Sequence, residues 1–256
     1  SYVLAAESLD TPIIGRMVRV EDLIHDWNRV GGARRPIGRL MFDDETLRDG
    51  LQSPSVVDPP IALKLELLHV MDALGIHTAN LGLPGAGGRP REDILRLAKE
   101  IADNRLSIGA NVACRTVVSD IEPVVEMTQK AGIPIEVCAF IGSSAIRQYA
   151  EDWSLERMLQ NTRDALRFCR DHDLPVMYVT EDTSRAFPEM IKALYSEAIE
   201  LGARRVCVCD TVGHATPQGA AAVVRFVKEE IVDKLDPQVG IDWHGHRDRD
   251  LAIANC

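Results

Sequence analysis

Short apolar runs alternate with helical segments from residue 39 to the end of the chain. The helical segments have apolar residues at helical spacing and occupy residues 59–74, 91–102, 119–131, 154–171, 186–201 and 217–230. The runs typical of strands occupy residues 40–44, 76–83, 106–114, 133–140, 174–180, 203–210 and 239–246. Strands joined by helical crossovers lie parallel, so this pattern predicts a parallel sheet covered by helices.

Two architectures compete for this pattern, an open doubly wound sheet and a (β/α)8 TIM barrel. The 256 residues and a regular repeat of roughly 30–35 residues favour the barrel. A dinucleotide-binding fold requires a glycine fingerprint, and the best candidate, GLPGAGGRP at 82–90, has Pro90 where the third glycine belongs. We therefore predict a TIM barrel with seven visible strands, and we expect its eighth strand beyond residue 256.

The first 38 residues differ from the rest of the chain. Residues 20–30 (VEDLIHDWNRV) predict one short amphipathic helix, and GGARRPIG after it is a breaker-rich connector. We interpret residues 1–38 as an N-terminal extension and residues 39–256 as a C-terminally incomplete catalytic barrel.

Composition excludes several classes of partner. A formal net charge of −10 argues against nucleic acid and anionic membranes. No apolar stretch approaches the length of a transmembrane helix, and the first residues lack the features of a signal peptide. The six cysteines are scattered without a CxxC pair, which favours reduced thiols in a cytoplasmic protein.

Cys207 and Cys209 stand two residues apart on a predicted strand and should face the same way. They could form a metal-binding pair or pack in the core. Core packing is the favoured interpretation, because the spacings that would supply further metal ligands are missing.

Polar residues cluster directly after the predicted strands, where a barrel has its active site. In DWHGHRD (242–248), His244 and His246 should project together from the end of a strand. A divalent ion held by two imidazoles usually takes a carboxylate as well, and FDDETLRDG (42–50) offers Asp43, Asp44, Glu45 and Asp49. Arg48, beside Asp49, could hold a substrate oxygen that the metal polarises.

Six motifs in order resemble one enzyme superfamily, that of the isopropylmalate synthases, homocitrate synthases and hydroxymethylglutaryl-CoA lyases. The resemblance covers about residues 39–256 and is closest to the isopropylmalate synthase-like acyltransferases. The motifs are DETLRDGLQSP (44–54), ACRT (113–116), FIGSSAIR (140–147), VTEDTSR (179–185), CDTVGHATP (209–217) and HGHRDRDLAIAN (244–255).

The resemblance implies a metal-dependent acyltransferase that condenses acetyl-CoA with a 2-oxo acid in amino-acid biosynthesis. It implies Asp49, His244 and His246 as ligands of a divalent ion (Zn, Mg or Mn), and a homodimer. It matches Arg48 to the residue that stabilises the oxyanion and Glu181 to a catalytic position, as base or as positioner. The positions that it implies for substrate binding are Gln52, Asn80, Arg147 and Thr211.

Several departures from the superfamily pattern bear on the substrate. Asn80 stands where glutamate is usual, Val179 where serine is usual, and Met177 where glutamate or arginine is usual. Met177 leaves a second substrate carboxylate without a charged partner, which favours an apolar or small 2-oxo acid. Arg147 could restore that contact or could lie on the surface. Asp250 replaces a glycine.

Two alternatives stay open: a carbon–carbon lyase or aldolase that uses the same metal site, and a degenerate barrel without catalysis.

Overall fold

The computed structural model describes residues 11–13, 16–18 and 40–256. The chain divides into two compact units, Ser1–Leu40 and Met41–Cys256. In the first unit, β1 (Thr11–Ile13) pairs antiparallel with β2 (Arg16–Val18). The helix predicted at residues 20–30 lies outside the described residues.

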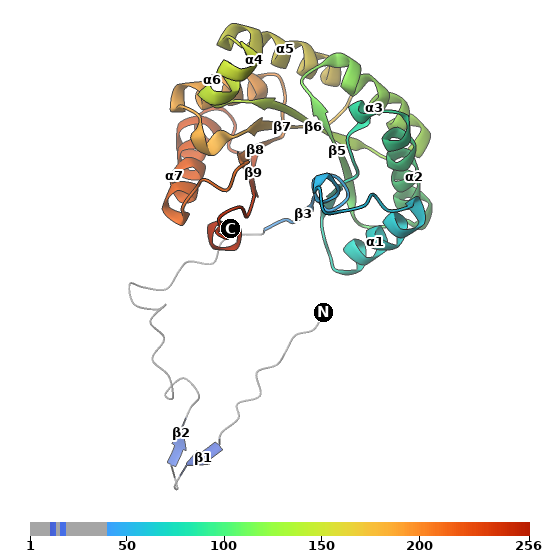
Figure 1. Cartoon of the computed structure of the whole chain (residues 1–256), viewed down its shortest axis with the longest axis vertical. Helices are drawn as coiled ribbons and strands as arrows, with labels where there is room; N and C mark the ends of the chain where they lie inside the picture. Colours follow the sequence, from blue (N-terminus) through green and yellow to red (C-terminus); the bar gives the residue numbers. More distant parts are fainter. Residues whose placement is uncertain (1–10, 14–15, 19–39) are drawn as a thin grey trace. The chain divides into compact units, whose positions relative to one another are not determined.

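The second unit is built on one sheet of seven parallel strands, as predicted. The strands pair in the order of the sequence, which gives the sheet order β3-β4-β5-β6-β7-β8-β9. They are β3 (Asp43–Asp44), β4 (Thr78–Asn80), β5 (Gly109–Arg115), β6 (Ile135–Gly142), β7 (Val176–Glu181), β8 (Arg205–Asp210) and β9 (Gly240–Gly245). The sheet curls into an arc (Figure 1). In the described part of the chain β3 and β9 are its two edges, so seven strands of a TIM barrel are present and the barrel is not closed.

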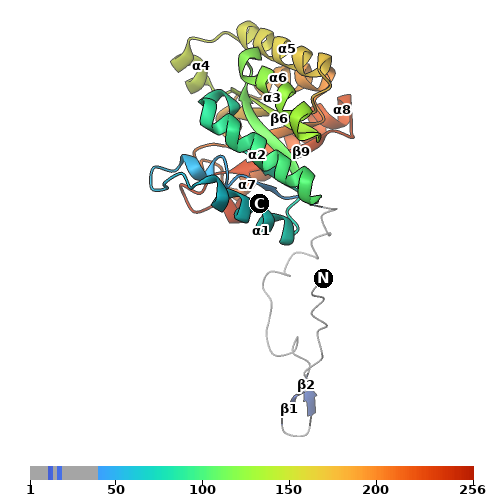
Figure 2. The same ribbon diagram turned by 90° about the vertical axis from the view of Figure 1, so that its right-hand side faces the viewer.

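The helices cover the outer side of this arc (Figure 1). All six predicted helical segments are helices: α1 (Ile61–Ala73), α2 (Gly88–Asn104), α3 (Val118–Ala131), α5 (Leu155–Asp171), α6 (Pro188–Glu200) and α7 (Pro217–Val227). In Figure 2, α2 runs across the front between α1 and α5. The structure also has three short helices, α4 (Ala145–Glu151), α8 (Asp233–Leu235) and α9 (Ala252–Asn255), of which the sequence did not predict the first two. No described helix is both long and apolar enough to cross a membrane.

The ends of the helices follow from local chemistry. The hydroxyl of Ser154, the predicted N-cap of α5, accepts a hydrogen bond from the backbone N–H of Arg157 at 3.2 Å. At the other end of α1, Gly75 adopts the left-handed conformation that stops a helix, with φ at +79°. The first strand is shorter than the predicted run 40–44, because only Asp43 and Asp44 pair with β4.

The two faces of each strand enter different environments. Outward residues such as Val137, Tyr178 and Val208 are fully buried in the main core between sheet and helices. On the inward face, Cys138, Met177, Cys207 and Cys209 form a second, small cluster with Val179 packed against it. The interior of the arc is therefore lined by thiols and a thioether. This lining is separate from the main core, which packs the sheet against the helices.

Nearer the amino ends of the strands, the inward layer is polar and ionic. The carboxylate of Asp43 accepts a hydrogen bond from the Asn111 side chain at 2.7 Å. Arg205 donates to Asp242 at 2.9 Å and also pairs with Glu136. Burial raises the pKa of Asp242 to about 6, although the charge of Arg205 opposes that rise. This layer lies on the amino-terminal side of Cys207 and Cys209, which follow Arg205 on β8.

Candidate functional site

Asp49, His244 and His246 meet at the carboxyl ends of the strands, although almost the whole chain separates them in sequence. The two histidines come from β9 and the residue directly after it, and their Nε2 atoms lie 3.2 Å apart. The Asp49 Oδ2 atom lies 3.8 Å from Nε2 of His244 and 3.5 Å from Nε2 of His246. The structure therefore places the three side chains that the sequence predicted as metal ligands around one point.

These donors fit a divalent metal ion. One ligand atom from each residue lies within 4.8 Å of the other two. Among the described residues, this is the only group of three or more His, Cys, Asp or Glu side chains that is close enough to hold one metal ion. Two imidazoles and one carboxylate on one face are a common ligand set for divalent ions, with coordination positions left open for substrate. Burial, together with the charge of neighbouring Arg48, lowers the pKa of His244 to about 4, so the imidazole is neutral at pH 7. A metal ion requires that neutral form.

A neighbouring loop holds the histidine pair in place. The backbone N–H of His246 donates to the carbonyl of Asp210 at 3.2 Å. Gly213, with φ at +58°, approaches so closely that an added Cβ would lie 3.1 Å from the carbonyl oxygen of His246. The fully buried Asp210 carboxylate orders this loop by accepting hydrogen bonds from the Ser184 hydroxyl at 2.5 Å and the His214 backbone N–H at 2.9 Å.

Arg48 lies between two carboxylates beside the proposed metal ligands. Its Nε donates to Glu45 at 2.8 Å and its terminal nitrogen to Asp49 at 2.9 Å. Glu45 also accepts a hydrogen bond from the Asn80 side chain at 3.2 Å. Burial raises the pKa of Glu45 from 4.5 to about 7, against the lowering effect of Arg48. The sequence offered Glu45 only as one member of an acidic run, and its place in the site was missed.

The other predicted site residues differ in their positions. Gln52, Asn80, Glu181 and Thr211 all line the same cavity as the three proposed ligands. Arg147 is not part of that lining. It lies behind Glu181, to which its terminal nitrogen donates at 3.3 Å. The Thr211 hydroxyl oxygen accepts the backbone N–H of Asp182 at 2.8 Å, which leaves its own proton free to donate.

The cavity has a volume of about 300 Å³, and both polar and apolar side chains line it. Met177 and Val179, which the sequence placed on the inward face, do line it. The sequence did not identify the remaining lining residues: Leu83, Ala113, Cys138, Phe140, Cys207 and Cys209. Alternation along a strand could have found those on β5, β6 and β8 once the direction of one inward residue was known.

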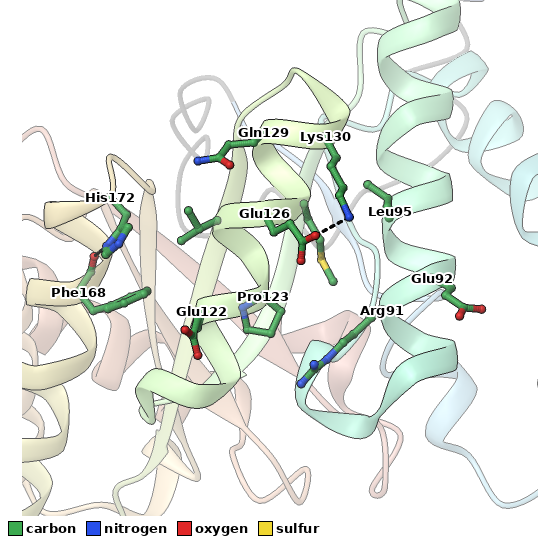
Figure 3. Close-up of a pocket in the computed structure, with 12 residues that line it drawn as sticks. Arg91, Glu92, Leu95, Glu122, Pro123, Glu126, Gln129, Lys130, Phe168 and His172 are labelled. Carbon is green, nitrogen blue, oxygen red and sulfur yellow. Dashed lines mark hydrogen bonds and ion pairs between the residues drawn. The ribbon is translucent and has the colours of Figure 1, made fainter.

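A larger hollow of about 650 Å³ lies among α2, α3 and α5 (Figure 3). It is lined by an ion pair between Glu126 and Lys130 and by Phe168, whose ring stacks on His172 at 4.1 Å. None of the predicted site residues lines it. The smaller cavity at the strand ends is therefore the candidate site, because it brings together metal donors, Arg48 and Glu181.

Comparisons with known proteins identify relatives of this chain. The chain is 31% identical over 83% of its length to a homocitrate synthase, AksA, from Methanopyrus kandleri, of which the match covers 50%. It is 28% identical over 85% of its length to a 2-isopropylmalate synthase from Lactococcus lactis subsp. cremoris, of which 41% is covered. The chain thus spans about half the length of the curated relatives that it matches.

A solved structure shares the fold. It is an HMG-CoA lyase from Acinetobacter baumannii in complex with coenzyme A and 3-methylmalate, with a TM-score of 0.66 and 17% identity. The likeness covers 84% of this chain and 69% of that one. The model of the HMGL-like family matches residues 39–256, which is the whole predicted barrel, so this chain belongs to the HMGL-like family.

Proposed function

We propose that this chain carries the catalytic barrel of a metal-dependent acyltransferase that condenses acetyl-CoA with a 2-oxo acid. The observation that carries the proposal is the convergence of Asp49, His244 and His246 beside Arg48 at the carboxyl ends of the parallel strands. The relatives named homocitrate synthase and 2-isopropylmalate synthase support the same class of reaction.

A divalent ion, Zn, Mg or Mn, held by the three ligands would supply Lewis-acid polarisation of the substrate ketone. The guanidinium of Arg48 is held by Glu45 and Asp49 next to this point, where it can donate to an oxygen that gains negative charge. Its two carboxylate partners fix its orientation before substrate arrives.

Proton transfer requires a group that reaches the methyl carbon of the thioester. Glu181 lines the cavity at the end of β7 and is the candidate base, or a positioner of that carbon. Arg147 restrains its carboxylate from behind. Thr211 and Gln52 line the cavity with a hydroxyl proton and an amide, which suit hydrogen bonds to the substrate carboxylate.

The balance of charge favours a 2-oxo acid with an apolar side chain. Of the arginines and lysines in the described part of the chain, Arg48 alone lines the cavity, and two carboxylates already neutralise it. The apolar side chains that line the cavity include Met177, Val179 and Phe140. A second substrate carboxylate would be buried there without a partner, which is unfavourable.

A thiol-release assay tests the proposal. We expect free CoA only when the full protein, a divalent ion, acetyl-CoA and a 2-oxo acid are all present, with 2-oxoisovalerate or pyruvate preferred over 2-oxoglutarate and oxaloacetate. The matched control is His172→Ala, a histidine far from the site, which should behave as the wild type.

A carbon–carbon lyase is the second candidate, and the fold that the chain shares with HMG-CoA lyase favours it. That activity would appear as acetyl-CoA released from a 3-hydroxyacyl-CoA, with no reaction of free 2-oxo acids. If the protein binds no divalent ion, or turns over no substrate in either assay with metal present, the chain is a barrel without catalytic activity. The homodimer and the cytoplasmic location stay predictions, which gel filtration and cell fractionation would test.

A further inference from the structure

Two thiols on the floor of the cavity lie in contact with each other. The Sγ atoms of Cys207 and Cys209 are 3.8 Å apart, and both side chains point inward from β8. Each residue is 5% exposed, and that exposure opens into the cavity that the metal-binding side chains also line. Core packing was the favoured prediction for this pair, and it is confirmed: both residues are buried in the small inward cluster with Cys138 and Met177, which is separate from the main core.

The other thiols are placed differently. All six cysteines lie in the described part of the chain, and these two make the only sulfur–sulfur contact found there. Cys114 and Cys169 are fully buried in the main core, on the other side of the sheet. Cys256 is exposed, and Cys138 lines the cavity from β6. A reagent that must bond two sulfur atoms at once therefore finds one preformed pair.

We propose that Cys207 and Cys209 form a two-thiol binding site for trivalent arsenic compounds that carry one organic group. Such a compound forms two bonds to sulfur and keeps its third valence for the organic group. An arsine oxide combines with both thiols: two As–S bonds form, the arsenic–oxygen bond breaks, and the oxygen leaves as water with the two thiol protons. Arsenic stays trivalent, so the step requires no oxidant or reductant.

The separation of the sulfur atoms suits a single bridging atom. Bonds of about 2.3 Å from two sulfur atoms to one tetrahedral centre, as in zinc–thiolate sites, place the sulfur atoms about 3.8 Å apart. Bonds from arsenic to sulfur are similar in length. The pair needs little movement to close on the bridging atom, and the second bond forms at high effective concentration once the first is made.

The surroundings of the pair determine where the organic group goes. Toward the amino ends of the strands, the interior is occupied by the ion pairs of Arg205 with Asp242 and Glu136. In the other direction lies the cavity, whose lining includes the apolar side chains of Val179 and Met177. An aryl group on the arsenic therefore extends into the cavity and fills space beside the metal-binding side chains, while none of those three side chains is consumed.

The experiment is the reaction of the reduced full chain with phenylarsine oxide, read by intact mass and by thiol titration after denaturation. We expect one adduct per chain and a decrease from six titratable thiols to four, which is six minus the two bridged. A dithiol such as 2,3-dimercaptopropanol should reverse it, and an equal concentration of a monothiol should not. The content of bound divalent metal should stay unchanged.

Variants locate the adduct. Cys207→Ser and Cys209→Ser should each bind the arsenical at least about 100-fold more weakly, since the intramolecular second bond is lost. The matched control, Cys169→Ser, removes a thiol of the main core and should bind as the wild type. Retention of the adduct in Cys207→Ser, or its loss in Cys138→Ser, would overturn the assignment.

A test on the unmodified sequence covers the case in which a variant does not fold. The arsenical-treated wild type is alkylated under denaturing conditions, and the peptide that holds both thiols is analysed by mass spectrometry. Protection of Cys207 and Cys209 together supports the site. Protection of Cys256 or of any other pair refutes it. Neither readout depends on catalysis, so failure of the proposed condensation activity would leave this result unaffected.

Discussion

Replacing Glu45 with glutamine should stabilise the metal-free protein at neutral pH. Its side chain is 21% exposed, and burial raises its pKa from 4.5 to about 7 in the folded state. Between these two values the folded protein keeps the proton while the unfolded chain releases it. Stability therefore falls as the pH rises through this window, and the loss is complete above pH 7.

The magnitude follows from the two pKa values. A rise from 4.5 to about 7 lowers the free energy of unfolding by about 1 kcal/mol at pH 5, about 2 kcal/mol at pH 6 and about 3 kcal/mol at pH 8. Glutamine has nearly the same shape, and its amide oxygen can still accept from Asn80, but it carries no charge at any pH. The difference in stability between Glu45→Gln and the wild type should grow with pH in this way.

Urea unfolding at pH 5, 6 and 8 in the presence of EDTA measures the difference. EDTA is needed because a bound cation would offset the charge of the carboxylate. The matched control is Glu66→Gln on the exposed side of α1, where surface substitutions change stability by at most about 0.5 kcal/mol. A Glu45→Gln protein that is less stable than the wild type at pH 8, or a difference that does not vary with pH, would refute the reasoning.

Three further predictions concern the proposed ligands and the elements that hold them. His244→Ala should abolish binding of Mn²⁺ or Zn²⁺ measured by calorimetry; binding at wild-type affinity would remove this histidine from the ligand set. Gly213→Ala should weaken metal binding by about 10- to 100-fold, because the added Cβ would lie 3.1 Å from the carbonyl oxygen of His246. Gly132→Ala is its control: φ is also positive, at +72°, but nothing lies within 4 Å, so stability should fall while metal affinity is unchanged. Ser154→Ala should cost about 1 kcal/mol of stability in urea unfolding through loss of the α5 cap, and an unchanged midpoint would argue against that cap.

The sequence predicted the architecture well because strands and helices of this fold carry strong local patterns. All seven strands and the six longer helices lie within the predicted runs or close to them. α4 was missed for a physical reason: none of its residues is buried, so it has no apolar periodicity. Ser144 was its one signal, since its hydroxyl accepts the backbone N–H of Arg147 at 3.3 Å.

The candidate site was predictable only where alternation along one strand decides the direction of a side chain. The pair His244 and His246 is of this kind, and both project to the same point. The contacts of Glu45 were not predictable, because an acidic run also fits a solvated loop. Arg48 lies only three residues from Glu45, but Asn80 is brought to it by the pairing of β3 with β4, which the sequence does not specify. The position of Arg147 behind Glu181 likewise depends on a helix that the sequence did not predict.

The division of each strand into two faces has a consequence for how such a protein diverges. On β8, Val206 and Val208 pack outward into the main core, while Cys207 and Cys209 face the cavity. Neighbouring positions on β8 are therefore under different constraints: the outward residues must preserve the fold, and the inward residues determine which ligand the cavity accepts. A lineage can exchange the inward residues one at a time and acquire new specificity, while the alternate positions preserve the barrel unchanged.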